Sequence, residues 1–467
     1  MDTTNFTIES ILEGYRSKKF SAVEVVSAYL ERIEQHDKDL NSFITVTKAE
    51  ALKEAAERDS SGDFSLPLAG IPIALKDIFL TKGVKTTAAS NVLKDYIASY
   101  DATVVTRLKK AGAIILGKLN HDAWAHGSSG ENSDFGPTKN PWNTEFTPGG
   151  SSSGSAAAVS AGFSPVTTAT DTGGSIRLPA SFTNTVGLKP TYGRVSRYGI
   201  ISMASSLDSI GHITKTVMDS AIVLNATAGP DGLDATLHEN KPDDYTKNIK
   251  NGIKGMKFGI PKEFVGEGLS RDVSDVFEKT IEALKSLGAE IVYISLPNTE
   301  YGIATYYIIQ PSEVSSNLAR YDGIRFGSQR TEFGEEAKRR IMLGTFTLSS
   351  GYYDAYYKKA MQVRTLIKND FEKVFGEVDA LIAPVSPTLP WKLVEKNNDP
   401  LKMYLSDALT VTANIAGVPS LAVPAGFANG LPVGIQIMGP QFSEEKLFQI
   451  GYAYEQATEF YKQTPKL

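Results

Sequence analysis

The sequence predicts an α/β fold, built as a single large α/β/α sandwich with a mostly helical insertion. Short apolar runs of strand length alternate with amphipathic segments of helix length in both halves of the chain. The 467 residues would suffice for about three average domains, yet no internal repeat and no linker rich in proline or charge divides them. We therefore expect one domain over residues 1–467, with the helical segment at about 300–376.

Helix caps and apolar periodicity define the elements of the first third of the chain. Thr7 and Ser21 each begin a predicted helix, and Ser21-Ala-Val-Glu24 has the spacing of a capping box. The second helix is predicted to end at about residue 36. Buried strands are predicted at residues 69–76 and 112–117, with a helix at residues 103–111 between them.

The middle of the chain has a different texture. Residues 127–190 are crowded with Gly, Ser and Thr and contain few large apolar side chains, although residues 156–162 favour a helix. A long stretch of this kind inside a compact chain is typical of a functional or a disordered region. The alternation then resumes, with predicted strands at 256–260, 290–295, 378–383, 421–425 and 433–438 and helices at 271–287 and 443–458.

Composition excludes several classes of function. The 48 Lys and Arg against 53 Asp and Glu give a net charge of −5, and no basic cluster favours direct binding of nucleic acid. Cysteine is absent, which excludes disulfides, thiolate metal ligands and cysteine nucleophiles. The sequence contains neither an apolar run long enough to span a membrane nor a secretory signal pattern. We expect a cytoplasmic protein without a membrane partner.

Three motif matches lack the context that they require. Residues 112–118 match GxxxxGK, but Leu119 stands where a phosphate loop needs Ser or Thr for magnesium. Residues 150–154 match the GxSxG elbow of hydrolases, yet a polar loop precedes them instead of a buried strand. His121 and His126 have no carboxylate or thiol at ligand spacing, so no metal site is predicted.

One constellation does suggest chemistry: Lys76 at the end of an apolar strand, Ser151, and Ser175 in the run Asp171-Thr-Gly-Gly-Ser175. A serine nucleophile needs a base, and with few histidines available the candidates are a lysine or a carboxylate. Burial can lower a lysine pKa by the roughly 3 units that base catalysis near pH 7 requires. The glycine-rich turn before Ser175 can present backbone N–H groups to an oxyanion. From these residues alone, a flexible loop remains the alternative.

The same residues resemble the amidase signature family. Lys76, the run Gly149-Gly-Ser-Ser152 and Asp171-Thr-Gly-Gly-Ser-Ile-Arg177 match its signature in type and spacing. Residues 186–199, 204–208 and 349–359 resemble the branch of glutamine-hydrolysing subunits of tRNA-dependent amidotransferases. The resemblance covers nearly the whole chain. It implies the amidase signature fold, with a mixed central sheet and a signature core at about 65–215.

For catalysis, the resemblance implies a Ser-cisSer-Lys triad. Ser175 would be the nucleophile, Ser151 the middle serine in a cis peptide bond, and Lys76 the base. The backbone N–H groups of the nucleophile turn would hold the oxyanion, namely those of Thr172, Gly173, Gly174 and Ser175. Asp171 and Arg177 are expected to brace this turn as an ion pair rather than to react.

For the substrate, the resemblance implies a glutamine pocket formed by Tyr306, Arg340, Asp407 and Ser128. Arginine would bind the α-carboxylate of glutamine and aspartate its α-ammonium. The implied partners are a B-type subunit, a small C-type subunit, and tRNA through the complex. No cofactor is expected in this chain, whereas ATP and magnesium are expected at the B-type subunit, which would convert Glu-tRNA(Gln) to Gln-tRNA(Gln) with the released ammonia. The alternatives are a stand-alone amidase for a small amide and a non-catalytic assembly subunit.

The sequence departs from this branch at a few positions. Gly130 stands where the branch commonly has Thr, and Ser153 where it commonly has Gly. Leu178 replaces a common Gln, Pro311 follows the Tyr306 helix unusually closely, and residues 326–333 form a shorter segment than usual. The changes at Gly130, Pro311 and 326–333 bear on the substrate pocket more than on the triad, whereas Ser153 and Leu178 are not expected to touch the reaction.

Overall fold

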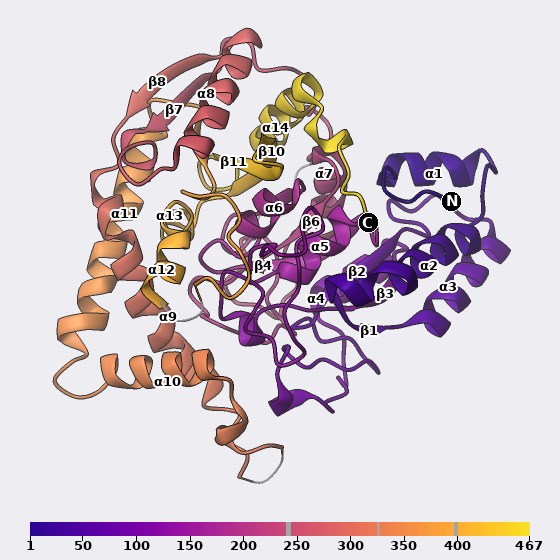
Figure 1. Cartoon of the computed structure of the whole chain (residues 1–467), viewed down its shortest axis with the longest axis horizontal. Coiled ribbons are helices and arrows are strands. Elements are labelled where there is room, and N and C mark those ends of the chain that lie inside the picture. The colour runs from indigo at the N-terminus through magenta and orange to yellow at the C-terminus, as the bar shows by residue number, and fades with distance from the viewer. Residues whose placement is uncertain (240–243, 325–326, 397–399) are drawn as a thin grey trace.

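The computed structural model describes residues 1–239, 244–324, 327–396 and 400–467. These residues form an 11-stranded sheet in the order β1-β3-β2-β4-β6-β5-β10-β11-β9-β7-β8. The sheet extends across the molecule from helices α1–α3 to the C-terminal half (Figure 1). The strands are β1 (Phe43–Val46), β2 (Pro72–Lys76), β3 (Ile114–Leu119), β4 (Val166–Asp171), β5 (Val186–Lys189), β6 (Ser209–Thr214), β7 (Lys257–Pro261), β8 (Glu290–Ile294), β9 (Ala380–Pro384), β10 (Ser420–Ala428) and β11 (Leu431–Met438).

The sheet is mixed, which confirms the expected fold class. Strands β3, β2 and β4 run parallel, as do β9, β7 and β8, and the other neighbouring pairs are antiparallel. Because β2 and β4 are parallel, their carboxyl ends meet at one edge of the sheet. Lys76 ends β2 and Asp171 ends β4, so this edge brings together two motifs that are about a hundred residues apart in the sequence.

Helices cover both faces of the central strands. They are α1 (Ile8–Arg16), α2 (Ala22–Leu40), α3 (Lys48–Ser61), α4 (Thr103–Lys110), α5 (Ser153–Ser160), α6 (Arg177–Thr183), α7 (Val217–Thr227), α8 (Arg271–Ser286), α9 (Gly302–Leu318), α10 (Glu335–Thr347), α11 (Lys359–Val374), α12 (Pro400–Tyr404), α13 (Val411–Ala416) and α14 (Glu444–Thr458). Successive side chains of a strand point to opposite faces. In β6, Ile213 packs with Ala156 of α5, whereas the adjacent His212 contacts Ser220 of α7 at 2.7 Å. Helices α5 and α7 therefore lie on opposite faces.

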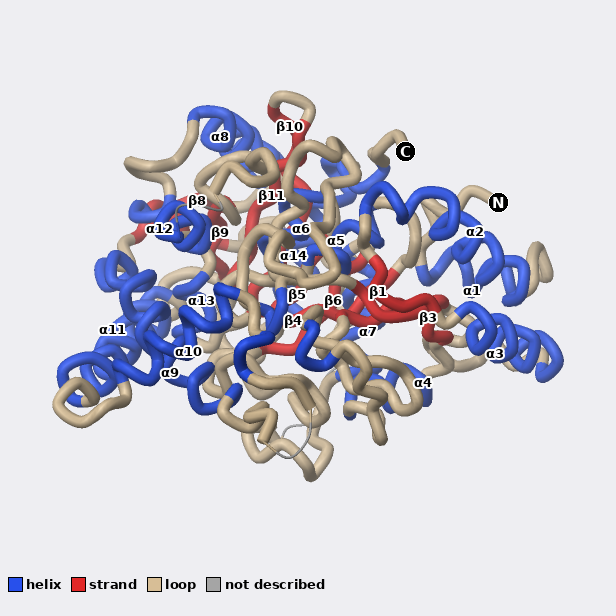
Figure 2. The backbone as a smooth tube through the Cα atoms, turned by 60° about the horizontal axis from the view of Figure 1, so that its bottom comes forward, coloured by secondary structure: helices blue, strands red, loops and turns tan. Residues whose placement is uncertain are grey.

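The predicted helices are present, with shifted ends. Both bonds of the Ser21 capping box form, and α2 lasts to Leu40 rather than to residue 36. The helical segment at 300–376 contains α9, α10 and α11, which gather at one end of the molecule (Figure 2). Pro311 lies inside α9 instead of following it. The expected shortening at 326–333 begins at a residue outside the described ones.

The segment rich in Gly, Ser and Thr is the most buried part of the chain. Every residue from 147 to 191 is buried. The segment contains α5 and α6 together with strands β4 and β5, neither of which the sequence analysis predicted. Small residues are needed here because the backbones approach closely: a Cβ on Gly154 would lie 2.5 Å from the carbonyl oxygens of Asn120 and Ser42. The alternative of a disordered segment was therefore wrong.

The rejected motifs have structural roles. The GxxxxGK match forms β3, where the Lys118 ammonium lies 2.9 Å from the buried Asp77 carboxylate. A loop rather than a strand precedes the GxSxG match at residues 150–154, as the sequence indicated.

None of the helices in the described ranges is long and apolar enough to cross a membrane.

Candidate active site

Lys76 lies at the carboxyl end of β2 in a ring of hydroxyl groups. Its Nζ donates to Ser151 Oγ, Ser152 Oγ and Thr170 Oγ1, each at 2.9 Å. The Lys76 side chain is completely buried, and the Gly150–Ser151 peptide bond is cis, as the resemblance implied. The structure thus brings the predicted base into direct contact with the predicted middle serine.

Burial controls the ionisation of Lys76. Loss of water around the ammonium lowers the Lys76 pKa from 10.5 to about 7, against the attraction of Asp122, Asp171 and Asp208, which raises it. The three hydroxyl groups around Nζ can both donate and accept hydrogen bonds, so they can solvate the neutral amine as well as the ammonium. Near neutral pH, a substantial fraction of Lys76 is therefore an unprotonated base.

Ser175 follows β4 at the start of α6, in the turn Thr172-Gly-Gly-Ser175. The backbone N–H of Ser152 donates to the Ser175 carbonyl at 3.2 Å, which connects the nucleophile turn with the segment that carries Ser151. Ser175 is 8% exposed, whereas Lys76 and Ser151 are 0% exposed. Of the three predicted triad residues, the candidate nucleophile is therefore the one that solvent can reach.

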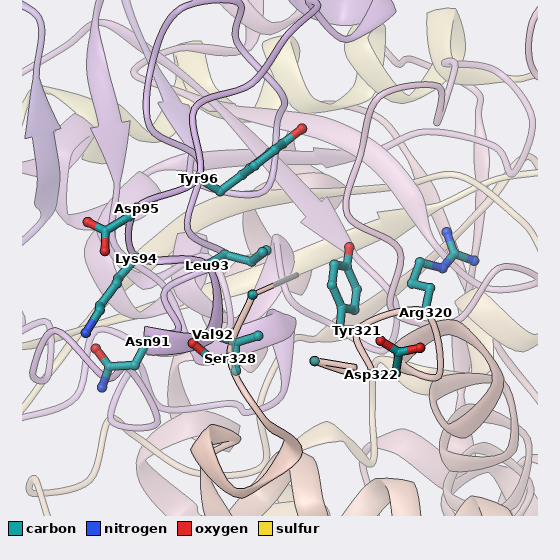
Figure 3. Close-up of a pocket in the computed structure, with 12 residues that line it drawn as sticks. Asn91, Val92, Leu93, Lys94, Asp95, Tyr96, Arg320, Tyr321, Asp322 and Ser328 are labelled. Carbon is teal, nitrogen blue, oxygen red and sulfur yellow. The ribbon is translucent and has the colours of Figure 1, made fainter. Parts of the chain in front are cut away.

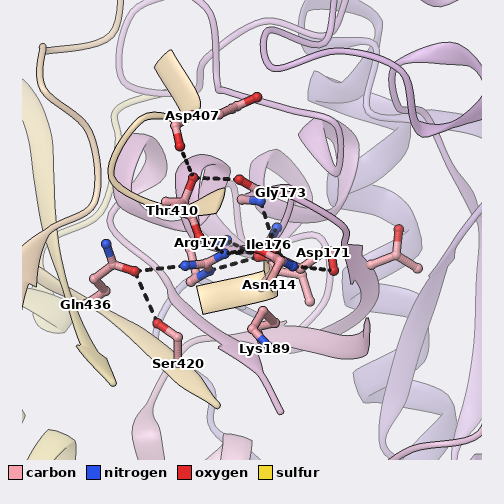
Figure 4. A network of polar contacts seen from close by, with 12 residues as sticks. Asp171, Gly173, Ile176, Arg177, Lys189, Asp407, Thr410, Asn414, Ser420 and Gln436 are labelled. Carbon is pink, nitrogen blue, oxygen red and sulfur yellow. Dashed lines mark hydrogen bonds and ion pairs between the residues drawn. The ribbon is translucent and has the colours of Figure 1, made fainter. Parts of the chain in front are cut away.

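An ion pair braces this turn, as the sequence predicted. Asp171 Oδ1 accepts from Gly174 N at 2.9 Å, and Asp171 Oδ2 accepts from Ile176 N at 3.1 Å and from Arg177 Nε at 3.0 Å. Figure 4 shows the Arg177 guanidinium against two further segments: it donates to the Thr410 carbonyl and to Asn414 Oδ1 at α13, and to Gln436 Oε1 on β11. Burial alone would raise the Asp171 pKa, but Arg177 outweighs it and lowers the value to about 2. Asp171 thus stays ionised and holds the turn.

The turn also presents backbone donors. Because the Gly174 N–H already donates to Asp171, only part of the expected set of four oxyanion donors remains available. The described residues offer no hydrogen-bond acceptor to the N–H groups of Thr172, Gly173 and Ser175. These three N–H groups are the ones suited to bind a developing oxyanion.

Tyr306 and Asp407, two of the predicted substrate residues, lie next to the same turn. A Cβ on Gly173 would lie 2.8 Å from the Tyr306 hydroxyl oxygen, so Tyr306 covers the turn directly. Asp407 Oδ1 accepts from Ser128 Oγ, and Asp407 Oδ2 accepts from Tyr307 Oη, both at 2.9 Å. Burial raises the Asp407 pKa to about 6, although these two donors and Arg340 oppose the shift.

Arg340 is also buried, at 3% exposure. Its Nε donates to Glu336 Oε1 at 2.8 Å and its Nη1 to Gln310 Oε1 at 2.9 Å. The guanidinium carbon of Arg340 lies 5.5 Å from the centre of the Tyr307 ring. The hydroxyl group of Tyr307 in turn donates a hydrogen bond to Asp407. Tyr307 thus connects Arg340 and Asp407, the two residues predicted to bind the charged groups of the substrate.

Sequence reasoning missed several residues of the site. Ser152 and Thr170 flank predicted residues directly, and Glu336 precedes Arg340 by one helical turn, so adjacency and the i,i+4 spacing were usable signals. Thr410, Asn414 and Gln436 carry no such signal.

Two further features lie outside this set of residues. A surface pocket of about 430 Å³ is lined by residues 91–96, 320–323 and 327–328, none of which is a predicted site residue (Figure 3). Within the described part of the chain, no group of three or more His, Asp or Glu side chains could hold a metal ion.

A family model for amidases matches residues 24–448, most of the chain. The chain belongs to the amidase signature family. The assignment of the family's Ser-cisSer-Lys triad to Lys76, Ser151 and Ser175 stays a prediction.

Similar proteins within the family include A subunits of glutamyl-tRNA(Gln) amidotransferase. The chain is 52% identical to the A subunit of glutamyl-tRNA(Gln) amidotransferase from Geobacter metallireducens, with 99% of both chains covered. It is 51% identical to the same protein from Alkaliphilus metalliredigens, covering 100% of this chain and 99% of the relative. The crystal structure of the corresponding Thermotoga maritima protein aligns with a TM-score of 0.84 at 44% identity, over 98% of this chain and 95% of that one. A bacterial aryl acylamidase of the family aligns with a TM-score of 0.88 at 28% identity, over 98% and 97% of the two chains.

Proposed function

We propose that this chain is the glutamine-hydrolysing subunit of a tRNA-dependent amidotransferase. The observation that carries the proposal is the pair of buried, oppositely charged side chains of Arg340 and Asp407, which both contact Tyr307. A free amino acid carries a carboxylate and an ammonium on one carbon, and such a pair matches both. Full-length identity of about half to A subunits of glutamyl-tRNA(Gln) amidotransferase supports the same substrate.

In the proposed mechanism, the neutral Lys76 amine takes the proton of Ser151 as Ser151 takes the proton of Ser175. Ser175 Oγ attacks the carboxamide carbon of glutamine, and the N–H groups of Thr172, Gly173 and Ser175 stabilise the oxyanion. The tetrahedral intermediate collapses, the C–N bond breaks, and the Lys76 proton returns through Ser151 to the leaving ammonia. Water then attacks the glutamyl ester by the reverse proton path and releases glutamate.

Tyr306, Arg340, Asp407 and Ser128 are the proposed substrate residues. Arg340 binds the α-carboxylate, Asp407 binds the α-ammonium, and Ser128 orients the Asp407 carboxylate. Tyr306, which covers the turn at Gly173, limits the space around the carboxamide. Positioning at both ends of the substrate holds the amide carbon at the nucleophile.

The released ammonia would pass to a B-type subunit, which activates Glu-tRNA(Gln) with ATP and magnesium, and a small C-type subunit completes the assembly. Binding of tRNA through these partners suits the net charge of −5 of this chain. Because the substrate is charged tRNA, we expect the complex in the cytoplasm. Residues 1–467 form one amidase domain, with the signature core at about 65–215 and the pocket segment at about 300–376.

The experiment is to measure ammonia and glutamate release from glutamine by the chain co-expressed with its partners, with and without charged tRNA and ATP. Release of ammonia and glutamate in equal amounts by the wild type, and loss of this release in the Ser175→Ala variant, supports the proposal. Hydrolysis of simple aryl amides with no activity on glutamine would instead favour the stand-alone amidase. The absence of activity on both, with assembly of the complex intact, would favour a non-catalytic subunit.

A further inference from the structure

The Arg340 side chain is held in place before any substrate arrives. Glu336 lies one turn before it on α10 and accepts from Arg340 Nε at 2.8 Å. Gln310 lies on α9, one turn after Tyr306, and accepts from Arg340 Nη1 at 2.9 Å. Gln310 is completely buried, and the Glu336 side chain is 13% exposed. Within the described residues, Arg340 Nη2 has no hydrogen-bond acceptor.

Glu336 also connects Arg340 with the other charged group of the pocket. Tyr404 Oη donates to Glu336 Oε1 at 3.3 Å, and the Tyr404 ring stacks on the Tyr307 ring with centres 3.9 Å apart. Tyr307 Oη in turn donates to Asp407 Oδ2 at 2.9 Å. A second chain of contacts, through Glu336 and Tyr404, thus runs from the Arg340 guanidinium to the Asp407 carboxylate, besides the direct contact of Arg340 with the Tyr307 ring.

We propose that Glu336 is a specificity-determining positioning residue of the glutamine pocket. It fixes the guanidinium so that the Nη2 end remains for the α-carboxylate of the substrate, and this role rests on the proposed glutaminase function. Because Glu336 occupies Nε, the side-on pairing through Nε and Nη2 is closed. A carboxylate must then bind at the Nη2 end, where Nη1 still has one N–H besides the N–H that donates to Gln310. Fixing the side chain during folding reduces the ordering cost of substrate binding.

The test compares three amides in the assembled complex. Glutamine carries both charged groups, glutaramate lacks the α-ammonium, and 4-aminobutanamide lacks the α-carboxylate. KM and kcat are measured for each, or the inhibition constant against glutamine where turnover is too slow. The variants are Glu336→Ala, Glu336→Gln and the matched control Glu335→Ala, whose side chain is 86% exposed on the same helix and pairs with Lys338.

Loss of one charge-assisted hydrogen bond to a buried group corresponds to about a tenfold loss of affinity or more. In Glu336→Ala we expect KM to rise about tenfold for glutamine and for glutaramate, with kcat within about twofold and 4-aminobutanamide unaffected. Glu336→Gln retains an acceptor for Nε and should restore KM to within about threefold of the wild type. The control variant Glu335→Ala should match the wild type on all three amides.

Other outcomes overturn the proposal. An equal loss on all three amides in Glu336→Ala would show a structural role only, and a lower KM would show that Glu336 competes with the substrate carboxylate. Failure of Glu336→Gln to restore KM would refute positioning by the hydrogen bond. If Arg340→Ala raises KM for glutamine while Glu336→Ala does not, the role of Glu336 fails but the proposed function stands. If the wild-type complex does not hydrolyse glutamine, the proposed function itself fails.

Discussion

The pH dependence of catalysis should report the ionisation of Lys76. The proposed mechanism requires the neutral amine, and burial lowers the Lys76 pKa from 10.5 to about 7. Because the deprotonated form is active, kcat/KM should rise with pH through this value and then level off. Replacement of Lys76 by Arg, which stays protonated, should abolish glutamine hydrolysis as fully as replacement of Lys76 by Ala.

The size of the effect follows from the environment of Lys76. The difference between 10.5 and about 7 corresponds to about 5 kcal/mol of lost preference for the ammonium. The neutral fraction is then about a tenth at pH 6, about half at pH 7 and about nine tenths at pH 8. We therefore expect kcat/KM at pH 8 to be about ten times its value at pH 6. An unburied lysine would instead give a rate that keeps rising tenfold per pH unit beyond pH 9.

The assay is kcat/KM for glutamine from pH 5.5 to pH 10 in the assembled complex. Burial also raises the Asp122 pKa to about 7, so the pH profile alone does not separate the titration of Asp122 from that of Lys76. Carbon NMR of labelled lysine, with the Lys76→Met variant to assign the signal, identifies which group titrates. An active Lys76→Arg variant, or a profile that still rises above pH 9, would refute a neutral Lys76 base.

Three further predictions follow from the same geometry. Ser175→Ala should reduce glutamine hydrolysis to background without changing the urea unfolding midpoint, and a variant with a tenth of the wild-type rate would contradict the assignment. Arg340→Ala and Asp407→Ala should each weaken glutamine binding by about 2 to 5 kcal/mol while the ammonia-dependent reaction of the complex is unchanged; equal losses in both assays would indicate that these residues maintain the fold. Asp171→Asn leaves the Arg177 charge buried without its partner and should cost about 3 to 5 kcal/mol of unfolding free energy in urea titrations, whereas a cost below 1 kcal/mol would refute the bracing role.

The elements that the sequence predicted correctly are those with strong periodicity or caps. Helix α8 was expected at residues 271–287 and lies at Arg271–Ser286, because a regular apolar stripe begins after a serine cap and ends before a glycine. Strands β4 and β5 were missed because their sequences, VTTATD and VGLK, lack the apolar run on which such predictions depend. Their burial comes from packing against α5 and α6, and the small residues of α5 (SGSAAAVS) let backbones approach closely. Periodicity does not encode that contact.

The candidate site likewise contains residues that the sequence predicts and residues that it does not. Lys76, Ser151 and Ser175 were predicted because their types and spacing resemble the amidase signature, and their assignment to the triad stays a prediction. Thr410 could not be predicted in this way: its Oγ1 donates to the Gly173 carbonyl at 2.6 Å, across more than two hundred residues of sequence, and also lies 3.1 Å from the carbonyl oxygen of Asp407. Through Thr410, the segment that carries Asp407, the proposed ammonium-binding residue, also holds the turn before Ser175, the proposed nucleophile. A contact of this kind forms only once the strands are assembled.

Two departures from the family pattern, Gly130 and Ser153, compensate each other. A Cβ on Gly130, where φ is +82°, would lie 2.5 Å from Ser153 Cβ, so the serine fills the space that the glycine leaves. Gly130→Ala should therefore cost about 1 to 3 kcal/mol more unfolding free energy than Gly62→Ala. Gly62 is a control for backbone strain alone, because its φ is +61° and no atom lies within 4 Å of its added Cβ. In the Ser153→Gly background the extra cost should vanish, and urea unfolding of the double-mutant cycle measures it. Additivity within about 0.5 kcal/mol would mean that the loop relaxes around the new methyl group and that the two departures are independent.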